Sequence, residues 1–136
     1  MKTLGLDVGD KNIGIALGED ILATEYDTLR GLSWQEAISE ILDICQREEV
    51  GKIIIGMPKN MNDNSEGIQA KKVRQFYQNL IKATKIPIFL EDETLTSVQA
   101  EEMLKDEGLN PQQAKERIDQ LSAKLILQQY LESNES

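Results

Sequence analysis

The chain has 136 residues, a net charge of −9 and a single cysteine, and it contains no histidine. The absence of histidine excludes serine–histidine and cysteine–histidine catalysis, and together with the lone cysteine it argues against a tetrahedral zinc site. A metal ion would therefore need oxygen ligands, which favours magnesium or manganese. The acidic charge argues against strong nonspecific nucleic-acid binding, although it permits a local basic patch.

The length suits one domain spanning residues 1–136. No apolar run approaches the roughly 20 residues that cross a bilayer, and the N-terminal segment turns polar too early for a signal peptide. With one cysteine unable to form an internal disulfide, these features predict a cytoplasmic protein with no membrane association.

The first part of the chain predicts an antiparallel meander of three strands. Residues 3–8 alternate between an apolar face and a face that holds Gly5 and Asp7. Residues 9–12 have the composition of a hairpin turn. The next strand carries small residues on one face, namely Gly14, Ala16 and Gly18, and residues 21–29 complete the meander.

Helices and strands alternate in the remainder. Ser33 and Glu36 have the spacing of a capping box, which predicts a helix from Ser33 with Cys45 in its apolar stripe. Residues 52–57 predict a buried strand of a parallel sheet. A helix near residues 73–81 and a strand at 86–90 follow.

Two further helices are expected, one starting near Thr96 and one with Asn110 as N-cap and Pro111 as first residue. The order of elements predicts an α/β fold, in which an antiparallel three-strand meander and two parallel strands form a mixed five-stranded sheet. Right-handed crossovers place helices on both faces of that sheet.

Three acidic positions are candidates for a site. Asp7 interrupts an apolar strand near its end, where small residues of the neighbouring strand leave room for something bulky, although it could instead cap the hairpin. Residues 91–93 are all acidic and follow the last strand. This position is the sheet edge where ligands bind in α/β folds, and the alternative interpretation is a solvated acidic loop. Asp119 faces inward on the final helix, although by itself it is better explained as the edge of an amphipathic helix.

These carboxylates would repel one another unless a divalent cation held them together. One or two magnesium ions so held can activate a water and stabilise the leaving oxygen during phosphodiester hydrolysis, which requires no histidine. Together the acidic positions therefore favour a metal-dependent hydrolase.

Four segments, in order, resemble the YqgF (RuvX) proteins of the ribonuclease H-like superfamily: LGLDVGDKNIGIAL, IIIGMPKNMNDNSEG, DETLTSVQAEEML and IDQLSAKLIL. The resemblance covers nearly the whole chain and implies the ribonuclease H-like fold. It also implies a nuclease of structured nucleic acid, with pre-16S ribosomal RNA as the favoured substrate. Branched DNA, cut as a Holliday junction resolvase would cut it, is the alternative.

The resemblance carries the acidic residues of the family onto Asp7, Glu93 and Asp119, which would act in catalysis and hold Mg²⁺ or Mn²⁺. Thr94 and Asn12 stand where family members commonly have a basic residue. One phosphate or carboxylate contact of the family is therefore in question in this chain.

Five residues are expected to contact nucleic acid: Lys11, Lys59, Asn60, Lys71 and Arg74. The other reading of the last two is a solvated helix face. Aromatic residues make up only 4% of the chain, so recognition would depend on shape and backbone contacts more than on base stacking.

Two other classes of function stay open. The segment DVGDKNIG is also similar to the phosphate-binding hairpin of the actin, sugar-kinase and heat-shock ATPase group, but those folds need two such domains. A noncatalytic assembly factor that docks on a ribosomal particle is the other alternative. The sequence leaves a monomer and a homodimer equally open.

Overall fold

The structure is a computed structural model that describes residues 1–58, 67–93 and 96–133. Its elements in chain order are β1 (Lys2–Val8), β2 (Asn12–Glu19), β3 (Leu22–Arg30), α1 (Trp34–Arg47), β4 (Val50–Pro58), α2 (Ile68–Ala83), β5 (Ile88–Glu93), α3 (Thr96–Asp106) and α4 (Pro111–Ser133). The strands form one sheet in the order β3-β2-β1-β4-β5. Strands β1, β2 and β3 pair antiparallel, and β4 pairs parallel to both β1 and β5. The predicted mixed sheet is confirmed.

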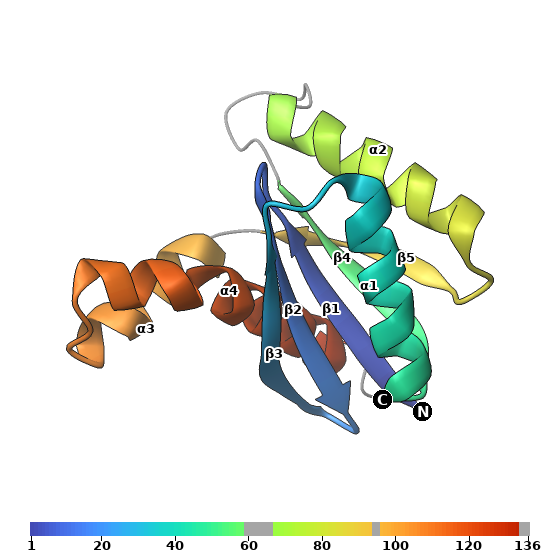
Figure 1. Cartoon of the computed structure of the whole chain (residues 1–136). Helices are drawn as coiled ribbons and strands as arrows, with labels where there is room; N and C mark the ends of the chain where they lie inside the picture. Colours follow the sequence, from blue (N-terminus) through green and yellow to red (C-terminus); the bar gives the residue numbers. More distant parts are fainter. Residues whose placement is uncertain (59–66, 94–95, 134–136) are drawn as a thin grey trace.

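Helices α1 and α2 cover one face of the sheet, and α4 covers the other (Figure 1). The larger core lies under α1 and α2, where branched residues such as Leu6, Ile15 and Ile55 are fully buried. A smaller core joins α4 to the opposite face through Ile54, Ile126 and other residues. Helix α3 packs on α4 in a third apolar cluster.

The face under α4 is built from residues with small side chains. A Cβ atom on Gly14 would overlap the carbonyl group of Asp119, and one on Gly5 would lie 2.7 Å from Cβ of Leu127. These glycines therefore let the helix backbone approach the sheet closely. The room around Asp7 that the sequence suggested is thus filled largely by α4.

The predicted helix starts agree with the structure where it describes them. Ser33 and Glu36 form the expected capping box, since each side chain accepts a hydrogen bond from the other's backbone N–H. Asn110 caps α4, because its side-chain oxygen accepts a hydrogen bond of 2.8 Å from the backbone N–H of Gln113. Strand β5 ends at Glu93, later than predicted, because its acidic residues continue the pairing with β4.

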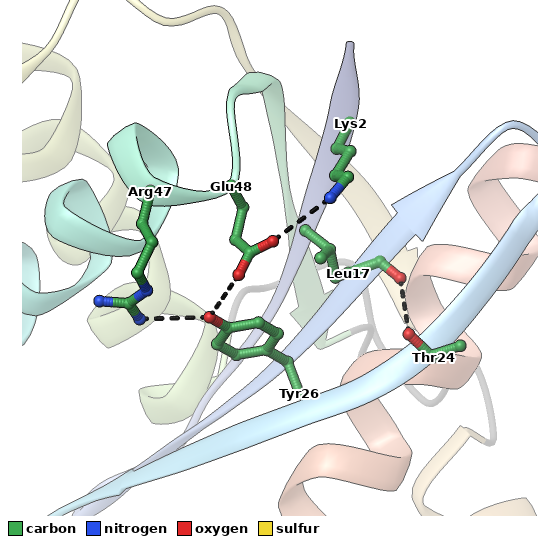
Figure 2. Close-up of polar contacts among 6 residues, drawn as sticks. All are labelled: Lys2, Leu17, Thr24, Tyr26, Arg47 and Glu48. Carbon is green, nitrogen blue, oxygen red and sulfur yellow. Dashed lines mark hydrogen bonds and ion pairs between the residues drawn. The ribbon is translucent and has the colours of Figure 1, made fainter.

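A polar network ties the sheet to the end of α1 (Figure 2). Lys2 forms an ion pair of 3.3 Å with Glu48, which also accepts a hydrogen bond of 2.9 Å from the hydroxyl of Tyr26. Arg47 donates to the same hydroxyl at 3.2 Å. The network joins β1, β3 and α1 near the N-terminal end of β1, away from Asp7.

Replacing Thr28 with valine is expected to leave the free energy of unfolding unchanged or to raise it by up to about 1 kcal/mol. Thr28 is buried, and within the described part of the chain its hydroxyl has no hydrogen-bond partner. Valine has a similar shape and no polar group to bury. Urea denaturation checks this, and Thr24→Val is the control because the Thr24 hydroxyl donates to the Leu17 carbonyl. A larger loss for Thr28→Val than for the control would contradict the prediction.

Candidate active site

Asp7 lies near the carboxyl end of the central strand β1, beside Gly14 of β2. Strands β1, β4 and β5 are parallel, so their carboxyl ends meet at one edge of the sheet. In α/β sheets this edge is the usual place for ligands. Asp7 is partly buried there, on the face that α4 covers.

The pairing of β5 with β4 decides which acidic residue of this strand faces the same way as Asp7. Gly56, which contacts α4, pairs with Glu91, and Met57 of the opposite core pairs with Asp92. Because side chains alternate along a strand, Glu91 and Glu93 point to the α4 face and Asp92 points away from it. This geometry favours Glu93 over Asp92, as the family resemblance implied.

Asp119 approaches from α4. Its backbone rests against Gly14, at the position where a side chain on the strand would block the helix. Its carboxylate oxygen Oδ2 accepts a hydrogen bond of 3.2 Å from the side-chain amide of Asn12. Two contacts with β2 therefore hold Asp119 at the same edge of the sheet as Asp7.

The electrostatics link the three carboxylates. Burial, followed by the charges of Glu93 and Asp119, raises the pKa of Asp7 from 3.8 to about 8. Both neighbours are thus close enough to disfavour ionisation of Asp7. A buried carboxylate with two acidic neighbours and a pKa so raised is typical of a functional site.

The donor set contains only oxygen atoms, which suits Mg²⁺ or Mn²⁺. In the described ranges, however, no three acidic, histidine or cysteine side chains already surround one point as metal ligands would. The residues fit a hard cation by their chemistry, by their shared edge and by the raised pKa of Asp7. Binding would require their side chains to turn toward the ion.

The metal-free protein is expected to lose stability as the pH rises from about 4 to about 8. The pKa of Asp7 is higher in the folded chain than in the unfolded one, so the folded state binds more protons in this window and stability falls as they leave. The lowered pKa of Glu36 has the opposite effect, but at pH values near and below 4.5. Urea denaturation in EDTA at pH 5, 7 and 9 measures the slope, and stability that rises from pH 5 to 9 would refute the sign.

Helix α2, on the opposite face of the sheet from α4, brings a basic residue to the turn that follows β1 (Figure 1). Lys72 of α2 forms an ion pair of 2.7 Å with Asp10 in the turn after β1, and Gln69 donates to the Val8 carbonyl. The start of α2 therefore lies beside this turn (Figure 1). Lys11 in the turn is exposed.

The structure describes three of the five residues that were predicted to contact nucleic acid, namely Lys11, Lys71 and Arg74. Lys71 and Arg74 are exposed on α2. Lys59 and Asn60 lie outside the described residues, as does Thr94.

Sequence reasoning missed the contact between Asn12 and Asp119. It treated Asn12 only as a departure from a commonly basic position. The signal was the period-two pattern, because Asn12 belongs to the face of β2 that holds Gly14 and therefore meets α4.

The sheet order and the layers of helices define a ribonuclease H-like fold of the resolvase type. The structure is similar to that of "T. thermophilus RuvC in complex with Holliday junction substrate", with a TM-score of 0.60 and 13% identity over 98% of this chain and 94% of that one. It is also similar to the "Fowlpox virus resolvase and substrate Holliday junction DNA complex", with a TM-score of 0.58 and 12% identity over 98% of each chain.

The chain belongs to the RuvX family, whose model, described as a Holliday junction resolvase, matches residues 1–133. A relative from Thermoanaerobacter pseudethanolicus is 42% identical over 100% of this chain and 99% of its own length. One from Caldanaerobacter subterraneus subsp. tengcongensis is 41% identical over the same shares. Both are named "Putative pre-16S rRNA nuclease". The family resemblance seen in the sequence motifs is thereby confirmed.

Proposed function

We propose that this chain is a divalent-metal-dependent nuclease that processes pre-16S ribosomal RNA. The observation that carries the proposal is the geometry that brings Asp7, Glu93 and Asp119 to one edge and one face of the sheet, and the raised pKa of Asp7 agrees with it. Such a group of carboxylates gains stability from a bound cation, since the cation offsets both burial and mutual repulsion. The names of the full-length relatives favour a ribosomal RNA precursor as the substrate.

In this mechanism Asp7, Glu93 and Asp119 would hold Mg²⁺ or Mn²⁺ through their carboxylate oxygens. When bound, the cation supplies an activated water and stabilises the leaving oxygen of the phosphodiester. Asp7 must lose its proton to become a ligand, and its raised pKa means that the cation and the proton compete for it. The close docking of α4 on β2 supports a fixed position from which Asp119 would act.

The substrate backbone would lie along the basic side of the same edge. In this proposal the exposed residues Lys11, Lys71 and Arg74 would supply positive charge to the substrate backbone, and Lys59 and Asn60 would extend this surface. Because the chain carries a net charge of −9, binding would be confined to this edge. The contacts of lysine and arginine with phosphates would make the affinity fall as the salt concentration rises.

A second candidate is cleavage of branched DNA, which the description of the family model and the fold shared with two resolvases support. A symmetric junction would suit a homodimer, whereas a ribosomal RNA precursor can be cut by a monomer.

No helix in the described part of the chain is long and apolar enough to span a membrane. A cytoplasmic location and contact with a ribosomal particle are part of the proposal.

The test is a cleavage assay on a pre-16S RNA fragment and on a synthetic four-way DNA junction, each with Mg²⁺ or Mn²⁺. We expect the wild-type chain to cut the RNA, and the variant Asp7→Asn, Glu93→Gln, Asp119→Asn to be inactive. Asp92→Asn is the matched control, because Asp92 is on the same strand but faces the other way.

Two results would contradict the proposal. Cleavage that survives in the triple variant would place the chemistry elsewhere. No cleavage of either substrate by the wild-type chain would favour the noncatalytic assembly factor instead. Preference for the junction over the RNA would select the second candidate.

A further inference from the structure

Asn12 is held in a fixed place by the turn between β1 and β2. Its carbonyl accepts a hydrogen bond of 2.9 Å from the backbone N–H of Gly9. The neighbouring Lys11 carbonyl accepts one of the same length from Gly31, which ties the turn to the end of β3. The backbone that carries Asn12 is therefore set by the same hairpin that carries Asp7.

The side chain of Asn12 meets a residue 107 positions away. Its amide donates to Oδ2 of Asp119 at 3.2 Å, and the contact is partly buried. The reach is short because Gly14, the next residue on this face of β2, lets the backbone of Asp119 lie against the strand. The absence of a side chain at Gly14 thus makes the hydrogen bond between Asn12 and Asp119 possible.

The chemistry of Asn12 and Asp119 determines the direction of the hydrogen bond between them. An ionised carboxylate only accepts hydrogen bonds, so the nitrogen of the amide must face Asp119. Asn12 thereby orients the carboxylate through Oδ2, and it does so without adding a charge. A lysine or arginine in its place would instead pair with Asp119 through a positive charge.

We propose that Asn12 is a positioning residue, which orients Asp119 for a divalent cation without itself adding a positive charge beside it. This inference rests on the proposed function, because it assumes that Asp119 is a metal ligand. Residues that orient metal ligands in this way typically alter metal affinity about 10–100-fold when they are removed.

The experiment measures Mn²⁺ affinity by titration calorimetry in the wild-type chain, Asn12→Ala and Asn12→Gln. We expect Asn12→Ala to weaken Mn²⁺ binding about 10-fold, at the low end of the range for such residues. Asn12→Gln keeps the amide on a longer side chain, so its affinity should fall between the other two. Circular dichroism melting of each variant confirms that it is folded.

Gln129→Ala is the matched control. Gln129 of α4 also donates an amide hydrogen bond to a carboxylate on this face, at 3.0 Å to Glu91, but Glu91 is not a proposed ligand. The control should bind Mn²⁺ as the wild-type chain does. Asp119→Asn should bind it much more weakly.

The outcomes separate this inference from the proposed function. If the wild-type chain binds Mn²⁺ and Asp119→Asn does not, but Asn12→Ala binds like the wild type, only the role of Asn12 is overturned. The same holds if Asn12→Ala lowers the melting temperature and leaves the affinity unchanged, since that is a structural effect. If the wild-type chain binds no Mn²⁺, the metal site of the proposed function falls, and this inference falls with it.

Discussion

Replacing Asp7 with asparagine is expected to stabilise the metal-free protein and at the same time to abolish cleavage. At pH 8 to 9 an ionised Asp7 is disfavoured by burial, Glu93 and Asp119, and asparagine removes that charge while keeping the shape. The gain in the free energy of unfolding should be on the order of a few kcal/mol. It should be small near pH 4, where Asp7 is already protonated.

The loss of activity should be at least about 100-fold, the scale seen when one group of a preorganised electrostatic site is removed. Urea denaturation in EDTA and a cleavage assay with Mg²⁺ measure the two effects on the same preparations. Asp10→Asn is the control, because Asp10 is an exposed carboxylate in the adjoining turn, paired with Lys72 on the surface. Its substitution should change stability by less than about 1 kcal/mol.

A single result would separate a structural aspartate from a site residue. If Asp7→Asn destabilised the metal-free chain, Asp7 would be a hydrogen-bonded part of the fold, and the account of its pKa would be wrong.

Replacing Gly14 with alanine is expected to lower the free energy of unfolding by about 3 kcal/mol or more, at the upper end for overpacking. The added Cβ atom would overlap the carbonyl carbon and oxygen of Asp119, which are backbone atoms and cannot turn aside. Helix α4 would have to move away from β2. Asp119 would move with it, so Mn²⁺ affinity should fall as well.

Gly18→Ala is the matched control on the same strand and face. Its Cβ atom would lie 3.0 Å from Cδ1 of Leu131 and 3.1 Å from Cδ2 of Leu127, which are ends of flexible side chains. Alanine also has a lower conformational entropy in the unfolded chain than glycine, so this variant should stay within about 1 kcal/mol of the wild type. Equal stabilities for the two variants would contradict the close docking of α4.

Much of the fold follows from local patterns in the sequence. Period-two alternation placed Asp7 and Gly5 on one face of β1, and the capping box marked the start of α1. The order of strands and helices gave the sheet because short hairpins force antiparallel pairing and long crossovers allow parallel pairing.

The packing of helices on the sheet could not be read in this way. The small residues at Gly14 and Gly18 were interpreted as room for something bulky near Asp7, and the structure shows that helix α4 fills this room. The sequence shows that one face of a strand carries small side chains, but it does not show which helix covers that face. The covering helix depends on contacts between segments more than 100 residues apart. The hydrogen bond from Asn12 to Asp119 was missed for the same reason.

The acidic triplet was predicted in part from the sequence and explained in part only by the structure. The triplet 91–93 belongs to β5 and not to a loop, and its pairing with β4 turns Glu93 toward the α4 face and Asp92 away from it. The resemblance to the family had selected Glu93, but the physical reason appears only in the register between the two strands. No pattern within the triplet itself distinguishes its members.

The most direct measurement is an anomalous-difference map from crystals grown with Mn²⁺. We expect a peak at the carboxyl edge of the sheet, with oxygen atoms of Asp7, Glu93 and Asp119 at about 2.2 Å from it. A peak held by other residues, or a map without a peak at this edge while Mn²⁺ supports cleavage, would contradict this expectation.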